Sequence, residues 1–256
     1  MKFHCFTLGC KVNQYETQAM ERRLVALGNT PAPENEADAL IVNTCTVTAV
    51  ADRKNRTLIH RLRREHPDAV VGVCGCYAQV STDDVAAMGV DVVSGSGGRD
   101  EFVQLLLQAC RERGTAPVVA VDAALKRRDF ERLPAGGLRE RTRAMLKVQD
   151  GCNNFCTYCI IPYARGPVRS LPLTEAVAQA KALAEAGYRE IVVRASRSPR
   201  GVGISATAAA SQTSPRRCAT PCRKRASASA RWSRAWWTRR SAAALPRART
   251  SARSST

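Results

Sequence analysis

The sequence predicts an α/β fold built around a parallel β-sheet, and two patterns in the first 112 residues carry this prediction. Short apolar runs alternate with longer stretches whose apolar residues recur at helical spacing. Three of the runs end at a cysteine, namely Cys10, Cys45 and Cys76. Strand, helix, strand repeats of this kind build parallel sheets whose strand ends share one edge, and that edge is where such folds bind ligands.

The apolar runs and the helical stretches give the expected elements in chain order. Strands are expected at residues 2–8, 39–43, 69–73 and 90–93. Helices are expected at residues 13–28, 50–66 and 101–111. The buried face of the first helix is expected to carry Tyr15, Ala19, Leu24 and Leu27. Residues 1–112 are therefore expected to form one domain, which is an ordinary size for a folding unit.

A second unit is expected after a connector at residues 113–143, which is rich in Arg, Pro and Gly and holds a short strand at residues 118–121. This unit has a strand, a loop with three cysteines, a helix capped by Thr174 and a further strand. The two strands and the helix are expected at residues 144–148, 190–193 and 174–187. The inward face of the helix is expected to carry Ala176, Val177, Ala180, Leu183 and Ala184.

The loop of the second unit contains the most specific pattern in the chain. Cys152, Cys156 and Cys159 lie in the segment CNNFCTYC, with the spacing C-x3-C-x2-C. Three thiolates this close together can hold three irons of a cubic cluster and leave the fourth iron open for chemistry. A closed zinc site needs a fourth Cys or His, and no His follows His66, so zinc binding or a chance spacing is the weaker alternative.

Cys10, Cys45 and Cys76 form a second set, because parallel topology brings three strand ends to one edge of the sheet. Three thiolates from three loops can hold another cluster with an open iron. Three ordinary buried cysteines fit the same spacing equally well, since free cysteine is among the most buried residue types. Spacing alone leaves both interpretations open.

Four segments together resemble the radical S-adenosylmethionine (SAM) methylthiotransferases, and the resemblance covers most of the first 193 residues. The segments are GCKVNQYET (9–17), NTCTVT (43–48), GCYAQ (75–79) and CIIPYARG (159–166). Within that family, the letters KVNQ and TVT are most similar to the branch that acts on N6-threonylcarbamoyladenosine at position 37 of transfer RNA. The branches that act on isopentenyladenosine or on a ribosomal protein usually differ at these letters.

The resemblance implies a fold, two cofactor types and a set of metal ligands. The parallel-sheet unit corresponds to the family's N-terminal methylthiotransferase domain, and the second unit to the start of a radical SAM partial (β/α) barrel. The implied cofactors are two 4Fe-4S clusters and SAM. The implied ligands of the auxiliary cluster, here called the first triad, are Cys10, Cys45 and Cys76. The implied ligands of the reactive cluster, here called the second triad, are Cys152, Cys156 and Cys159.

The resemblance also implies an activity, that of a tRNA (N6-threonylcarbamoyladenosine(37)-C2)-methylthiotransferase. The hydrogen on an adenine C2 is not acidic, so a radical must remove it, and such chemistry is supplied by cofactors rather than by side chains. The implied partners are tRNA and an electron donor such as a flavodoxin or ferredoxin. The protein is expected to be a cytoplasmic monomer that makes no membrane contact, because no apolar run reaches the length of a membrane span.

Three residues near the second triad each have two interpretations. The family places an aromatic residue against the adenine of SAM where Tyr158 lies, whereas a core aromatic that shields the cluster from water fits the position as well. Arg165 and Arg169 are candidates for contacts to phosphate or to the carboxylate of the cofactor. Lone arginines in loops are more often solvated, which is the alternative for both.

The charge of the chain is concentrated at its end. The net charge is +18, yet residues 1–193 hold 25 basic and 22 acidic groups, a net charge of only +3. Residues 194–256 contain 15 Lys plus Arg, no Asp or Glu, and all three tryptophans, without a sustained hydrophobic period. This composition predicts a disordered basic tail rather than a packed domain.

Two explanations of the tail lead to two functional hypotheses. A natural Arg- and Trp-rich tail would bind RNA, and the chain would then be a non-catalytic iron or zinc protein with an RNA-binding tail. Alternatively, a GC-rich gene read out of frame after about residue 193 yields Arg, Ala, Ser and Pro in this manner. A one-base shift can turn codons for residues 194–200 into TGVEIAS, which resembles the family, so we favour a truncated methylthiotransferase here. Gene sequencing that finds no indel near codon 193 would refute the frameshift.

Overall fold

The computed structural model describes residues 1–112, 116–137 and 143–195. The predicted tail lies outside the described residues apart from Arg194 and Ala195, which belong to a strand at Glu190–Ala195. The first part of the chain forms a six-stranded sheet in the order β2-β1-β3-β4-β5-β6, in which every paired strand is parallel. The strands are β1 (Lys2–Thr7), β2 (Thr30–Pro31), β3 (Ala39–Thr44), β4 (Val70–Gly75), β5 (Val92–Ser94) and β6 (Val118–Ala120). This architecture confirms the predicted α/β fold.

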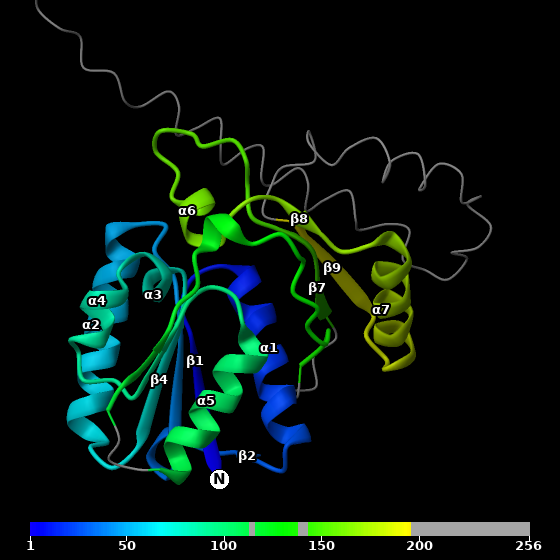
Figure 1. Cartoon of the computed structure of the whole chain (residues 1–256). Coiled ribbons are helices and arrows are strands. Elements are labelled where there is room, and N and C mark those ends of the chain that lie inside the picture. The colour runs from blue at the N-terminus through cyan, green and yellow to red at the C-terminus, as the bar shows by residue number, and fades with distance from the viewer. Residues whose placement is uncertain (113–115, 138–142, 196–256) are drawn as a thin grey trace, which may run out of the picture. The chain divides into compact units, whose positions relative to one another are not determined.

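Helices cover both faces of this sheet (Figure 1). They are α1 (Lys11–Ala26), α2 (Ala49–Glu65), α3 (Cys76–Val80), α4 (Thr82–Ala86) and α5 (Arg99–Arg111), with a short 3-10 helix η1 (Glu34–Glu36). Alternate residues of β3 serve the two faces, because side chains along a strand point to opposite sides. Ile41 packs with α1 and α5, whereas Leu40 and Val42 pack with α2, α3 and α4.

A smaller sheet in the order β8-β7-β9 follows. The remaining elements are η2 (Ala124–Lys126), β7 (Arg143–Asp150), α6 (Ile161–Arg165), β8 (Arg169–Ser170), α7 (Leu173–Glu185) and β9 (Glu190–Ala195). Tyr15 and Ala19 of α1 pack with Met145 of β7 and Leu183 of α7 in a third apolar core. The phenol of Tyr15 also donates a hydrogen bond to the Leu133 carbonyl, at 2.8 Å. Helix α1 thus packs against both sheets.

Three expectations about helices are wrong. Leu27 is 40% exposed because α1 ends at Ala26 and the chain turns there. Thr174 does not cap α7, whose N-cap residue is Pro172 and makes no side-chain capping bond. Leu183 is the only buried residue of α7, and Val177 is 46% exposed, because in the described part of the chain the three-stranded sheet covers only a narrow strip of this helix.

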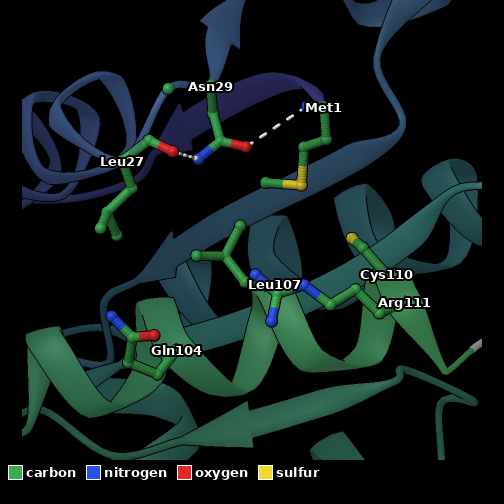
Figure 2. Close-up of a pocket in the computed structure, with 8 residues that line it drawn as sticks. Met1, Leu27, Asn29, Gln104, Leu107, Cys110 and Arg111 are labelled. Atoms are coloured by element: carbon green, nitrogen blue, oxygen red, sulfur yellow. Dashed lines mark hydrogen bonds between the residues drawn. The ribbon is translucent and has the colours of Figure 1, made fainter.

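A pocket of about 390 Å³ lies at the amino end of the large sheet (Figure 2). There the terminal amino group of Met1 donates to Asn29 Oδ1 at 3.3 Å. The lining residues are Met1, Leu27, Gly28, Asn29, Gln104, Leu107, Cys110 and Arg111. They come from the start of β1 and the carboxyl ends of α1 and α5, so the pocket lies away from the strand ends that carry the predicted ligands. No described helix combines the length and the apolar character needed to span a membrane.

Candidate metal centres

The cysteines of the first triad come together at the carboxyl edge of the large sheet. Cys10, Cys45 and Cys76 follow β1, β3 and β4, which are neighbours in the strand order. Cys45 and Cys76 are buried and Cys10 is exposed. The pKa of the Cys76 thiol is raised to about 11, chiefly by burial and also by negative charge on Glu16, Cys10 and Cys45, against the lowering effect of Arg165. The topology of the sheet therefore places the three thiols at one edge.

The loops of the first triad approach each other so closely that side chains are excluded. Gly9 has φ +97°, and a Cβ there would lie 2.3 Å from Cys45 Cβ and 2.6 Å from Cys45 Sγ. Gly75 has φ +104°, and a Cβ there would lie 2.4 Å from the Thr44 carbonyl oxygen. Glycine is the residue that tolerates both this backbone conformation and this contact. Glycine is therefore required immediately before Cys10 and immediately before Cys76, because no side chain fits where these loops meet.

Two asparagines, Asn13 and Asn43, hold the loops of the first triad together. Asn13 Nδ2 donates to the carbonyl oxygens of Leu8 and Thr44, at 2.9 and 2.7 Å. Asn43 Nδ2 donates to the Asn13 carbonyl oxygen at 3.0 Å. These bonds tie the loop after β1 to the loop after β3, so both asparagines act as cross-links between the segments that carry Cys10 and Cys45.

The second triad lies on the loop between β7 and α6. Cys152 and Cys159 are partly buried, whereas Cys156 is exposed. The Cys159 amide donates to the Cys156 carbonyl at 2.9 Å, and Phe155 adopts φ +43°, a conformation uncommon for a residue with a side chain. The Cys152 amide donates to the Gly166 carbonyl at 3.0 Å, which closes the loop on the end of α6.

Neither triad has the arrangement of a mononuclear zinc site. Thiolates about 2.3 Å from one tetrahedral ion lie about 3.8 Å apart. Within the described ranges, however, one group alone places three metal-binding atoms within 4.8 Å of one another, and it contains no cysteine. Ligands of a cubic cluster bind different irons and therefore stand further apart than the ligands of a single ion.

The surroundings of the first triad also contain unsatisfied polar atoms. Among the described residues, Asn43 Oδ1 and Arg99 Nε are buried without a hydrogen-bond partner. Buried polar atoms are nearly always paired, so such exceptions often mark a place where a further group binds. Asn43 Oδ1 is an acceptor and needs a donor, whereas the three thiols at one edge of the sheet and the glycines before two of them fit a bound iron–sulfur cluster.

The non-cysteine group consists of Glu34, Glu65 and His66. Arg61 bridges the two carboxylates of this group. Its guanidinium donates to Glu34 Oε1 and Oε2 at 2.5 and 3.1 Å and to Glu65 Oε2 at 2.9 Å. His66 Nε2 lies 3.1 Å from Glu34 Oε1. Arg61 pairs with both carboxylates and Arg64 pairs with Glu65 as well, so the group is a surface ion-pair network.

A buried ion cluster lies between the two triads, and we call it the Glu16 cluster. Its members are Glu16, Arg99, Lys147, Asp150 and Arg165, all at most 5% exposed. Glu16 Oε1 accepts bonds from Arg165 Nη1 at 2.8 Å and Lys147 Nζ at 3.0 Å. Arg99 Nη2 donates to Glu16 Oε2 at 3.1 Å. Burial alone would raise the pKa of Glu16, but these three cations hold it well below its ordinary value.

The Glu16 cluster changes the interpretation of both loop arginines. Arg165 is 2% exposed and Arg169 is 7% exposed, so the expectation that they are solvated is wrong. Arg165 Nη1 lies 3.1 Å from Asp150 Oδ1, and Arg169 Nη2 lies 3.8 Å from Asp150 Oδ2. Both guanidinium groups thus form ion pairs with a carboxylate of this chain. The sequence had suggested no such partner for either arginine.

Tyr158 lies on the surface of the second triad. Its side chain is 74% exposed, so the interpretation as a core aromatic that shields a cluster is wrong. The ring of the neighbouring Phe155 contacts Tyr163 edge-on instead, with 5.7 Å between ring centroids. An exposed aromatic beside Cys159 remains available to stack on a ligand.

Four residues of the site were not predicted from the sequence, namely Glu16, Arg99, Lys147 and Asp150. One signal was present, because Lys147 and Asp150 interrupt or end the apolar run that forms β7. A charged residue in a strand buried on both sides needs a partner of opposite charge. Lys147 pairs with Asp150, three positions along the chain, but its other partner, Glu16, lies 131 positions away and no local pattern could have indicated it.

Comparisons with known proteins match two separate segments of the chain. Residues 2–95 match a family described as the uncharacterized protein family UPF0004, and residues 146–194 match the radical SAM superfamily. The threonylcarbamoyladenosine tRNA methylthiotransferase MtaB of Bacillus subtilis (strain 168) is 46% identical over 193 residues, which are 75% of this chain and 42% of that protein. The MtaB protein of Aquifex aeolicus (strain VF5) is 38% identical over 195 residues, 75% of this chain and 47% of that protein.

A relative with a different name is similar over the same share of the chain. The tRNA-2-methylthio-N(6)-dimethylallyladenosine synthase of Sphingopyxis alaskensis (strain DSM 13593 / LMG 18877 / RB2256) is 36% identical over 196 residues, 75% of this chain and 43% of that protein. The chain therefore spans less than half the length of each of these relatives.

The fold and the matched segments define a class of protein. A parallel α/β unit is followed by a strand whose exit loop carries C-x3-C-x2-C, and the segment from this strand onward is of the radical SAM type. The chain belongs to the radical SAM methylthiotransferase family, since residues 2–95 and 146–194 match the two family models and the stretch that holds them is 46% identical to a tRNA methylthiotransferase. The predicted family is thereby confirmed.

Proposed function

We propose that this chain carries the cluster-binding part of a tRNA methylthiotransferase, which inserts a methylthio group at C2 of N6-threonylcarbamoyladenosine at position 37. The observation that carries the proposal is the presence of two separate cysteine triads at strand exits in a chain 46% identical to a protein of that name. The relatives named for two different nucleosides are matched over similar lengths, so the choice between these nucleosides rests on the KVNQ and TVT segments.

The proposal assigns one 4Fe-4S cluster to each triad. With three thiolate ligands, each cluster keeps one iron free of protein ligands. At the second triad the free iron would bind SAM and supply the electron for its radical cleavage, which provides the chemistry that no side chain offers at an adenine C2. The exposed ring of Tyr158, next to Cys159, is suited to stack on the adenine of SAM.

The remaining assignments follow from this activity. Residues 1–112 would form the methylthiotransferase domain, residues 113–143 a connector, and residues 144–193 the start of the radical SAM domain. The partners would be tRNA and a one-electron donor such as a flavodoxin or ferredoxin, and the site of action the cytoplasm. We propose a monomer, because each triad is built from cysteines of one chain.

The test is SAM cleavage by the full chain after anaerobic reconstitution with iron and sulfide and reduction by dithionite. We expect 5′-deoxyadenosine from the chain and none from Cys156→Ala, which removes one ligand of the second triad. Two tRNA substrates, carrying threonylcarbamoyladenosine or dimethylallyladenosine at position 37, then report the nucleoside through the mass of the product. A chain that binds both clusters and produces no 5′-deoxyadenosine would contradict the proposed activity.

A further inference from the structure

Arg165 links the segment of the second triad to the loops of the first triad. It is the last residue of α6, which begins two positions after Cys159 and packs against α3, the helix that starts at Cys76. Its guanidinium is 2% exposed and uses its two ends differently. Nη1 donates to the carboxylates of Glu16 and Asp150, whereas Nη2 donates to Glu16 Oε2 at 3.3 Å and also reaches Asn13 Oδ1, at 2.8 Å.

Asn13 transmits this contact directly to the first triad. Its amide nitrogen already binds the carbonyl oxygens of Leu8 and Thr44, which flank Cys10 and Cys45. Cys10 Sγ lies 3.6 Å from the same Asn13 Oδ1 that Arg165 binds. A metal-bound thiolate has no proton to donate, so in the loaded site this oxygen would depend on Arg165. One side chain therefore separates the guanidinium from the loops that carry two ligands.

The charge balance around Arg165 leaves room for an additional anion. In the parts of the chain that the structure describes, the cations gathered here are Arg99, Lys147, Arg165 and Arg169. The carboxylates that face them are Glu16 and Asp150, together with Glu131, which accepts a bond from the Arg99 amide at 2.5 Å. Buried charges are normally compensated, and four cations face three carboxylates. The thiolates of the first triad would supply the missing negative charge.

We propose that Arg165 is a positioning residue of the first triad, which orients Asn13 and supplies buried positive charge to the cluster bound there. The segment that carries the second triad thus completes the first site. This inference rests on the proposed function, because it assumes that the first triad holds an iron–sulfur cluster. Positive charge near a cluster stabilises its reduced form and raises its reduction potential.

The experiment isolates the first cluster in the full chain by replacing Cys152, Cys156 and Cys159 with alanine. Iron content and the midpoint potential are measured by metal analysis and by a redox titration followed by electron paramagnetic resonance. Arg165→Met removes the positive charge. Arg165→Lys keeps the charge but cannot bind Glu16 and Asn13 at the same time through two guanidinium nitrogens. Arg143→Met is the matched control, because it causes the same change in net charge at an exposed arginine paired with Glu190.

We expect about four irons in the parent variant. Arg165→Met should lower the midpoint potential, Arg165→Lys should return most of the shift, and Arg143→Met should leave the potential unchanged. Loss of iron in Arg165→Met that Arg165→Lys restores would also support the proposal, since the charge would then be required for loading. Full iron and an unchanged potential in Arg165→Met would overturn it. A parent variant without iron would instead refute the proposed function of the first triad, and this inference with it.

Discussion

Replacing Glu16 by glutamine is expected to lower the free energy of unfolding by about 3–5 kcal/mol, because removing one partner of a buried ion network leaves uncompensated charge. Glu16 is fully buried and accepts bonds from Arg99, Lys147 and Arg165. Glutamine keeps the shape of the side chain but offers these cations a neutral amide. Urea unfolding of the reduced, metal-free chain, followed by far-UV circular dichroism, measures the change.

Glu36→Gln is the matched control, because Glu36 forms an exposed ion pair with Lys2 and such pairs contribute little. The pH dependence supplies a second readout. The pKa of Glu16 is lowered well below its ordinary value of 4.5 in the folded chain, so its stabilisation is present above about pH 4.5 and is lost as the pH falls further. Glu16→Gln should reduce this acid sensitivity. Equal stability of both chains, or an unchanged acid transition, would contradict the assigned role of Glu16.

Replacing Gly9 by alanine is expected to abolish iron binding at the first triad. The new Cβ would lie 2.3 Å from Cys45 Cβ, and a residue with a side chain is also disfavoured at φ +97°. Relief of this overlap must move the loop of Cys10 or of Cys45. Iron after anaerobic reconstitution should fall from about eight to about four per chain, with the second triad still loaded.

Gly28→Ala separates backbone strain from steric overlap. Gly28 also has a positive φ, +80°, but a Cβ there meets no atom within 4 Å. This control should lose roughly 1–2 kcal/mol of stability through backbone strain and keep its full iron content. Retention of both clusters in Gly9→Ala would show that the observed closeness of the two loops is not needed for metal binding.

The sequence predicted the large sheet well, for a physical reason. The runs at β1, β3 and β4 are short and apolar, and a buried parallel strand requires that pattern. Parallel topology then places Cys10, Cys45 and Cys76 at one edge without further information. Prediction of helix α7 was less successful, because periodicity shows which face is apolar and not whether a neighbour covers it.

The Glu16 cluster lay beyond sequence reasoning because its contacts connect distant positions. Arg165 and Glu16 are 149 positions apart, and each looked like an ordinary charged residue on a loop or a helix. Charge usually predicts exposure, which is why Arg165 and Arg169 were expected in solvent. Burial became favourable only when two segments contributed opposite charges to the same place, and that depends on the tertiary structure.

Metal analysis of the anaerobically reconstituted chain, with Cys10→Ala and Cys156→Ala beside it, tests the two-site account most directly. Two independent 4Fe-4S clusters predict about eight irons in the unsubstituted chain and about four in each variant. The clusters retained by the two variants should differ, since each substitution removes a ligand from a different triad. One zinc per chain, or the loss of all iron after either single substitution, would contradict the account.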